Sequence, residues 1–190
     1  MVEQTRTQEH VPQLAVEGPE DFATIRSAHF NDIEMLNSIG ISLYLTNFGE
    51  YWTEAGLRAF AEKQFDPDEI ARDMETGSAS FYIVESGGAA IGFAKTKPSQ
   101  LLPGSKLTGT LLEKLYLQPT HTGKGIGQFV LAFLLEQARE KQAQLIWLDV
   151  LKPNHRAQRA YEKSGFRIVG EVPFDTDIQK IGFYVMALEL

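Results

Sequence analysis

The sequence of 190 residues contains no cysteine. This absence excludes disulfide bonds, thiolate metal sites and a cysteine nucleophile, and thiols therefore give no information about the redox compartment. Positive charge is also scarce, because 18 Lys and Arg stand against 25 Asp and Glu, which gives a net charge of −7. Nucleic-acid binders hold phosphates with clustered Lys and Arg, so this balance argues against a nucleic-acid partner and favours a neutral or cationic small molecule.

Long apolar runs are missing as well. The longest, at 129–135, stops at Glu136, whereas a membrane-spanning helix needs about 18 or more apolar residues. The first ten residues are polar and lack the apolar core of a signal peptide. We therefore expect a soluble, cytoplasmic protein with no membrane partner. The four histidines share no ligand-like spacing, so we expect no metal.

What is present is an ordinary globular composition, with 43% hydrophobic and 23% charged residues. No repeat, low-complexity tract or long linker interrupts the chain. We expect a flexible tail at residues 1–10 and a single domain at 11–190.

The spacing of apolar residues predicts the order of elements. In the first part we expect a short strand at 13–16, a helix from about 22 to 46 that starts near Gly18-Pro19-Glu20-Asp21, a helix at 54–65 and another from Asp66-Pro67 onward. After Gly77 we expect strands at 81–84, 91–94, 108–117, 145–150, 167–172 and 183–188, with helices at 125–141 and 154–163. This order predicts the α/β class: a mixed, mostly antiparallel sheet of about seven strands, flanked by helices and containing one crossover unit.

A glycine-rich segment follows the strand at 108–117 and leads into the apolar helix. It reads Gln118-Pro119-Thr120-His121-Thr122-Gly123-Lys124-Gly125-Ile126-Gly127. Glycines and the free N–H groups of a helix start form a cradle for a phosphate or diphosphate. The P-loop signature needs Lys-Ser/Thr after its second glycine, and a dinucleotide fingerprint needs glycine at Gln128, so both nucleotide motifs fail. Taken alone, the segment is also compatible with a simple tight turn.

A second group of residues lies about thirty positions further on. Asn154 and Tyr161 are seven apart, so on a helix they lie near one face, two turns from each other. Each residue by itself has a structural alternative: Asn154 as a helix cap and Tyr161 as a half-buried core aromatic.

The two segments together, Leu115-Tyr116-Leu117 through Gly127 and Leu148 through Phe166, resemble the GNAT superfamily of N-acetyltransferases. The resemblance covers about residues 80–190 and implies a GNAT-like fold with acetyl-CoA as co-substrate. It departs from the family at Thr122, where the family prefers Gln or Arg. The residues that the resemblance implies for cofactor binding are Leu115, Tyr116, Leu117, Thr122, Gly123, Lys124, Gly125, Ile126, Gly127 and Asn154.

The resemblance also implies that Tyr161 is the general acid for the departing thiolate. Attack on a thioester further needs a neutral amine, and a nearby carboxylate can remove the proton. Glu113 is our first candidate for this base and Asp149 the second. A solvated edge-strand acid is the alternative for Glu113, and an acid that holds a loop is the alternative for Asp149. A backbone N–H of 115–117 is expected to meet the oxyanion.

For the acceptor, a looser similarity to bacterial polyamine-type N-acetyltransferases points to a small cationic amine. It rests on Glu113-Lys114-Leu115-Tyr116, Ile146-Trp147-Leu148 and the stretch 48–74. Tyr44 or Tyr51, with Glu50 and Glu54, is expected either to line a pocket for a cation or to belong to the core. A protein or peptide amine as acceptor, a non-catalytic acyl-CoA-binding module, and a homodimer as the assembly all stay open.

Overall fold

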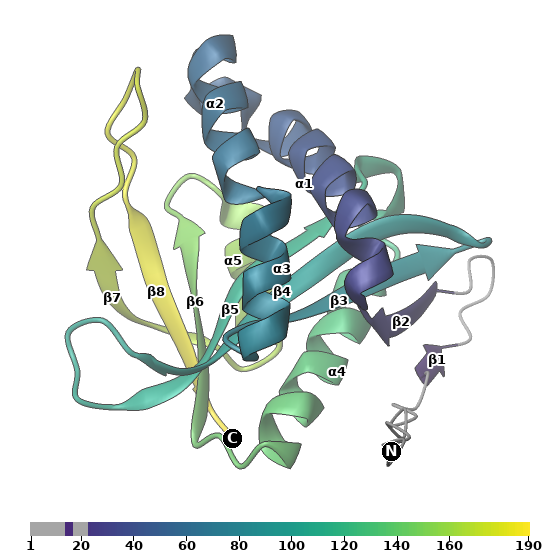
Figure 1. Cartoon of the computed structure of the whole chain (residues 1–190). Coiled ribbons are helices and arrows are strands. Elements are labelled where there is room, and N and C mark those ends of the chain that lie inside the picture. The colour runs from purple at the N-terminus through teal and green to yellow at the C-terminus, as the bar shows by residue number, and fades with distance from the viewer. Residues whose placement is uncertain (1–13, 17–22) are drawn as a thin grey trace, which may run out of the picture.

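The computed structural model describes residues 14–16 and 23–190. The strands in these residues form one eight-stranded sheet in the order β1-β2-β3-β4-β5-β6-β8-β7 (Figure 1). The strands are β1 (Leu14–Val16), β2 (Ala23–Ser27), β3 (Ser80–Ser86), β4 (Ala89–Leu101), β5 (Thr108–Leu117), β6 (Leu145–Leu151), β7 (Arg167–Val172) and β8 (Phe183–Glu189). All neighbours pair antiparallel except β5 and β6, which are parallel. The predicted mixed, mostly antiparallel sheet is thus confirmed.

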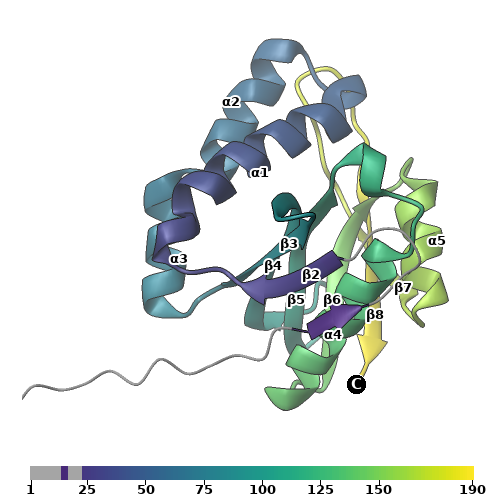
Figure 2. The ribbon, with the colours of Figure 1, turned by 90° about the vertical axis from the view of Figure 1, so that its right-hand side faces the viewer.

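Helices cover both faces of the sheet (Figure 2). The helices are α1 (Ile33–Phe48), α2 (Glu54–Gln64), α3 (Pro67–Thr76), α4 (Ile126–Glu140) and α5 (His155–Lys163), with short 3₁₀ turns η1 (Phe30–Asp32), η2 (Gly49–Tyr51) and η3 (Pro119–His121). Helices α1–α3 lie on one face, and α4 and α5 lie on the other. No helix among the residues described is long and apolar enough to cross a bilayer.

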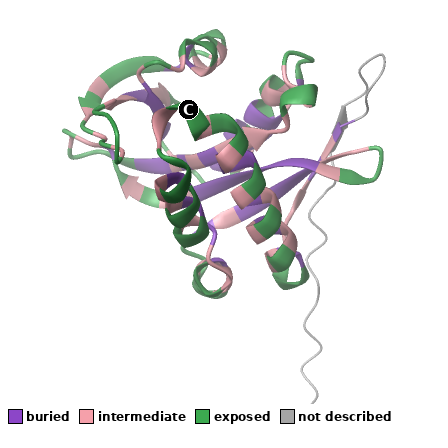
Figure 3. Cartoon of the chain, turned by 90° about the horizontal axis from the view of Figure 1, so that it is seen from above, coloured by how far each residue is buried: buried purple, intermediate pink, exposed green. Residues whose placement is uncertain are grey.

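The hydrophobic core lies on both sides of the sheet, whose central strands are buried while the outer sides of the helices are exposed (Figure 3). Val130 and Leu134 of α4 pack against Ile146 of β6 on one side. Leu36 of α1 packs in the cluster that contains Phe93 of β4 on the other. The apolar run that the sequence placed on a helix therefore lies in one of the two core layers, between α4 and the sheet.

One predicted element is wrong in part, because residues 23–27 form strand β2 and the helix begins only at Ile33. Ala23 and Ile25 are buried at the alternating spacing of a strand, whereas the helix was expected from the three-residue spacing of Phe22 and Ile25 in the sequence. The Arg26 guanidinium fixes the turn that follows, with Nη1 2.8 Å from Asp32 Oδ2. The tail at 1–10 and the helix start at 18–21 lie outside the described residues.

Strands β5 and β6 diverge soon after they meet, and this divergence positions the site. They pair only at Thr110–Ile146 and Leu111–Trp147, although β5 continues to Leu117 and β6 to Leu151. Each strand stays paired along its other edge, β5 with β4 and β6 with β8. Beyond Leu111, the edges that face each other therefore lack ladder partners and can pair with an extended ligand.

Candidate functional site

The glycine segment forms a sharp turn between η3 and α4. Gly125 is the N-cap of α4 and has φ 84°, in the left-handed region, and Gly123 has φ 83°. A Cβ added at either position would meet no heavy atom within 4 Å, so the space beside this backbone is open. In the described part of the chain, the N–H groups of Gly123, Gly125, Ile126 and Gly127 donate to no protein acceptor. These free donors at the start of a 15-residue helix form a site for an anion.

Thr122 belongs to the turn itself. Its N–H and its hydroxyl both donate to the carbonyl oxygen of Pro119, at 3.2 and 2.6 Å. The hydroxyl proton of Thr122 is therefore engaged with η3 in this structure, and its expected contact with the cofactor stays a prediction. Lys124 is exposed in the same loop.

The last residues of β5 place their side chains on opposite faces of the sheet. Leu115 and Leu117 pack toward α4, whereas Tyr116 points toward α1. Their backbone pairs with β4 on one edge, through Leu115–Ala94 and Leu117–Gly92. The other edge faces β6 where the two strands have diverged. The structure thus brings the 115–117 segment next to the glycine segment that follows it.

Asn154 is both a helix cap and a free donor. Its Oδ1 accepts a hydrogen bond from the Ala157 N–H at 3.0 Å, as the capping alternative predicted. Its side-chain amide donates to none of the residues described. The amide N–H₂ therefore stays available to a ligand.

Tyr161 is half-buried beside Phe166, with 5.7 Å between the ring centroids. Burial raises the pKa of its phenol to about 12, so the hydroxyl keeps its proton at neutral pH. Within the residues described, this hydroxyl has no hydrogen-bond partner. Burial also raises the pKa of Tyr116, and the phenols of Tyr44 and Tyr161 raise it further. Tyr116 lies on the face of the sheet that carries α1, and Tyr161 lies on the face that carries α4, near enough for the two phenols to interact electrostatically.

Two glutamines to which the sequence analysis assigned no role hold α5 in position. Gln128 of α4 donates to the carbonyl of Ala160 at 2.9 Å and accepts from the hydroxyl of Ser164 at 2.7 Å. The buried Gln158 donates to the carbonyls of Leu151 and Lys152, at 3.0 and 2.8 Å. These bonds fix Tyr161 relative to both the glycine segment and the end of β6. The only sequence signal was Gln128, which breaks the dinucleotide pattern.

Glu113 lies in an ion-pair network and not in free solvent. Its Oε1 is 2.9 Å from Lys97 Nζ, and its Oε2 is 2.9 Å from Lys95 Nζ and 3.6 Å from Lys114 Nζ. Lys95 also pairs with Asp73 of α3 at 2.7 Å. Burial alone would raise the pKa of Glu113, but Lys114, Lys95 and Lys97 lower it to about 2. A carboxylate held this firmly in its charged form is a weak base, which argues against Glu113 as the general base.

Lys114 shares this network and is almost completely buried. Burial lowers the pKa of its ammonium to about 8, and its Nζ donates to Gln64 of α2 at 3.0 Å. A bulge explains why Glu113 and Lys114 both face α2 and α3: Lys114 pairs with Lys95 and Leu112 with Thr96, which leaves Glu113 as the extra residue.

The aromatic and acidic residues that were expected near the acceptor differ in burial. Tyr44 is buried among other rings, and burial raises its pKa, so it belongs to the core. Burial also raises the pKa of the half-buried Tyr51, with a further contribution from Glu50. Glu54 is exposed at the start of α2. Asp149 on β6 is exposed two positions past the last β5–β6 pair, and desolvation still raises the pKa of its carboxyl.

Comparisons with known proteins identify the family and the fold. A family model described as "Acetyltransferase (GNAT) family" matches residues 41–166. An uncharacterized N-acetyltransferase of Lactobacillus delbrueckii subsp. lactis is 23% identical over 148 residues, which are 75% of this chain and 83% of that protein. Streptothricin acetyltransferase of Streptomyces lavendulae is 32% identical over 105 residues, 55% of this chain and 53% of that enzyme, so the match spans about half the enzyme's length. The PaiA N-acetyltransferase of Thermoplasma acidophilum, solved in complex with coenzyme A, superposes with a TM-score of 0.69 and 21% identity, covering 88% of this chain and 99% of that one.

Proposed function

Because the chain belongs to the acetyltransferase (GNAT) family, we propose that it moves the acetyl group of acetyl-CoA to a primary amine of a small cationic molecule. The family match supports the statement that an acetyl group is transferred, whereas the class of acceptor is our own proposal. The observation that most supports catalysis is the position of the unpartnered Tyr161 phenol, beside the divergence of β5 and β6.

The residues around this divergence fit acetyl-CoA. The free amides of Gly123, Gly125 and Ile126 suit its diphosphate. The open edge of 115–117 and the side-chain amide of Asn154 suit the pantetheine arm, which pairs as an added strand would. When bound, acetyl-CoA supplies the thioester that activates the acetyl group.

Tyr161 then acts as the general acid. A phenol with a pKa of about 12 stays protonated at neutral pH, whereas a thiol has an ordinary pKa of about 8.5. Full proton transfer from this phenol is therefore uphill, and much of its contribution is a hydrogen bond that strengthens as charge develops on sulfur. A main-chain N–H of 115–117 donates to the carbonyl oxygen in the same way.

Two observations support a small cation as acceptor. The net charge of −7 favours a cationic partner over an anionic one. One relative also carries the name of a small-molecule acceptor, streptothricin.

The test is release of free thiol from acetyl-CoA in the presence of single amines. The panel contains butylamine, 1,4-diaminobutane and a tripeptide with a free N-terminus, with N-acetylbutylamine as the unreactive control. We expect the diamine to be the best substrate by kcat/KM. A higher kcat/KM for the tripeptide would indicate a protein or peptide amine as the acceptor. If no amine raised thiol release above the rate of hydrolysis, the proposed function would be contradicted.

A further inference from the structure

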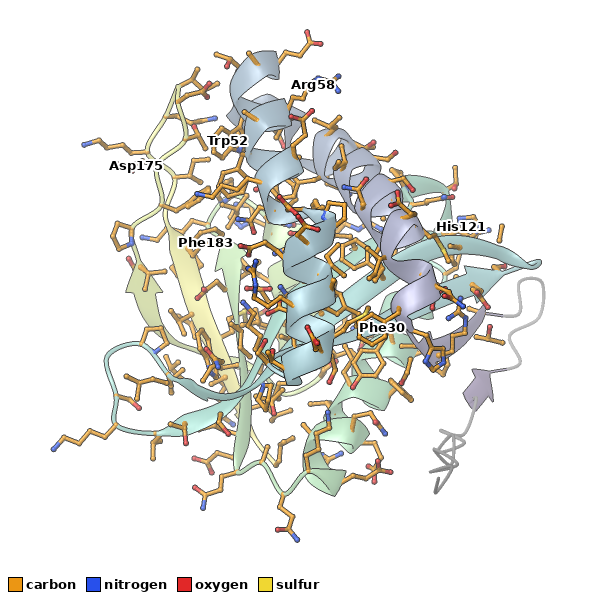
Figure 4. All side chains as sticks on the ribbon, viewed as in Figure 1. Phe30, Trp52, Arg58, His121, Asp175 and Phe183 are labelled. Atoms are coloured by element: carbon orange, nitrogen blue, oxygen red, sulfur yellow. The ribbon has the colours of Figure 1, made fainter. Side chains whose placement is uncertain are left out.

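A continuous aromatic cluster crosses the molecule from β5 to β8 on the face that carries α1–α3. Its members are Tyr116, Tyr44, Phe60, Trp52, Phe174 and Phe183. Successive ring centroids lie 6.1, 5.5, 4.8, 6.1 and 4.5 Å apart. Figure 4 shows two members, Trp52 before α2 and Phe183 at the start of β8. Because β6 lies between β5 and β8, the cluster extends from one side of β6 to the other.

The loop between β7 and β8, residues 173–182, is bound to the N-terminal helices and places Phe174 in this cluster. The carboxylate of Asp177 accepts hydrogen bonds from the N–H of Thr53, at 3.0 Å, and from its hydroxyl. The side chain of Gln179 donates to the carbonyl of Glu50 at 3.2 Å. These contacts join segments more than a hundred residues apart, so the cluster is built by tertiary structure and not by one element.

Asp149 projects from β6 on the same face as this cluster. Its neighbours Leu148 and Val150 pack toward α4, so the alternation of the strand directs Asp149 to the opposite face. Asp149 pairs with Val185 of β8, and Phe183 is two positions earlier on that strand. Diagonal neighbours of this kind have Cα atoms about 7–8 Å apart, within reach of an aromatic ring.

The carboxylate of Asp149 is also free. Among the residues described, none donates a hydrogen bond to it or forms an ion pair with it. This contrasts with Glu113, whose carboxylate is neutralised by three ammonium groups. A lone carboxylate within reach of an aromatic ring is a combination that recognises an alkylammonium ion, because the ring and the anion both attract the cation.

We propose that Asp149, with Phe183, Phe174 and Trp52, forms the binding subsite for the alkylammonium group of the acceptor, and that Asp149 is the base that deprotonates it. This inference rests on the proposed function and names the acceptor subsite for it. The proton passes from the ammonium nitrogen to a carboxylate oxygen of Asp149 and from there to solvent, to which Asp149 is open. The neutral amine nitrogen then forms the bond to the acetyl carbon as the carbon–sulfur bond breaks. The nitrogen loses its second proton to solvent, and the sulfur receives a proton from the Tyr161 phenol, which solvent reprotonates. One proton is thus released to solvent for each acetyl group transferred to an ammonium ion.

The experiment combines binding and kinetics on the full chain. Titration calorimetry with butylamine, in the presence of saturating coenzyme A, compares the wild-type protein with Asp149→Asn, Phe183→Leu and the control Glu75→Gln. Glu75 is exposed near the end of α3, so its change removes the same charge at a distant place. Circular dichroism confirms that each variant is folded. Thiol release with acetyl-CoA gives kcat and KM for the same proteins.

We expect Asp149→Asn to weaken butylamine binding roughly tenfold and to lower kcat/KM about 100-fold or more, with an unchanged KM for acetyl-CoA. Phe183→Leu should weaken amine binding with little change in kcat, and Glu75→Gln should resemble the wild type. Equal binding and turnover in the wild type and Asp149→Asn would overturn the inference and leave the proposed function standing. A wild-type protein that binds butylamine through Asp149 but transfers no acetyl group would support the subsite and contradict the proposed function instead. Absence of amine binding in the wild type would overturn the inference.

Discussion

At the scale of single residues, the surroundings of Tyr161 predict a catalytic defect without a binding defect. Its ring packs against Phe166, and a phenylalanine would keep this contact and lose only the hydroxyl. We expect Tyr161→Phe to lower kcat about 100-fold because the departing sulfur loses its hydrogen-bond donor. The affinity for acetyl-CoA, measured by calorimetry, should change less than about twofold, since the diphosphate contacts lie elsewhere. An unchanged kcat at saturating amine would remove Tyr161 from catalysis.

Glu113 is expected to stabilise the folded protein through its ion pairs. Glu113→Gln leaves the ammonium groups of Lys95, Lys97 and Lys114 without their common carboxylate, so we expect a loss of about 3 kcal/mol in unfolding free energy at pH 7. The pKa of Glu113 falls from its ordinary 4.5 to about 2 on folding. The unfolded chain therefore binds more protons between these pH values, and the stabilisation is complete above pH 4.5 and is lost as the pH falls through 2.

Urea denaturation at pH 7 and at pH 3 measures this difference. The gap between the wild type and Glu113→Gln should be smaller at pH 3. The matched control is Glu75→Gln, which removes an exposed carboxylate and should change stability by less than about 0.5 kcal/mol. Equal stability of the wild type and Glu113→Gln at pH 7 would show that the network contributes nothing.

The two candidate acids show what the sequence does and does not reveal about single residues. Glu113 and Asp149 both lie on strands, and the sequence analysis placed Glu113 first although no local signal describes the surroundings of either carboxylate. What separates them is the approach of Lys95 and Lys97 from β4, which is a tertiary fact. Asn154 and Tyr161 are different, because their spacing on one helix was enough to predict that they lie near one face.

At the scale of elements, the sequence predicted α4, α5 and the β3–β4 hairpin because each has a strong local signal, such as Gly87-Gly88 at the hairpin turn. Strand β2 was missed because five residues are too few to separate alternation from helical spacing. The divergence of β5 and β6 has no local signal at all. It depends on which neighbour each strand pairs with along its other edge.

The start of α4 gives a prediction about the glycine segment as a whole. Gly125 has φ 84°, so Gly125→Val strains the backbone and also fills the open space beside the free amides. We expect coenzyme A to bind at least tenfold more weakly in calorimetry. The matched control is Gly88→Val in the β3–β4 hairpin, where φ is 79° and the space is also open. That variant should be strained to a similar degree and bind coenzyme A normally. Equal weakening in both would mean that strain, and not the cradle, determines affinity.

At the scale of the whole molecule, the two ends of the sheet are joined by little backbone pairing. Between β5 and β6 there are two residue pairs, so other contacts must hold the halves together. They include the hydrogen bond from Gln128 to Ala160 and the bonds between Thr53 and Asp177. A ligand that contacts both β5 and α5 would add to these contacts and stabilise the molecule as a unit.

We therefore expect coenzyme A to raise the melting temperature of the whole chain in a single transition. At a free concentration one hundred times its Kd, a ligand that binds only the folded state adds about 2.7 kcal/mol. For a chain of 190 residues, this corresponds to a shift of about 5–10 °C. Adenosine, which lacks both the diphosphate and the pantetheine arm, serves as the control and should shift the transition by less than about 1 °C. Differential scanning calorimetry measures both. If the two halves melted separately, with only one of them shifted by coenzyme A, then the ligand would not bridge the divergence, and the placement of the pantetheine arm along β5 next to Asn154 of the opposite half would be wrong.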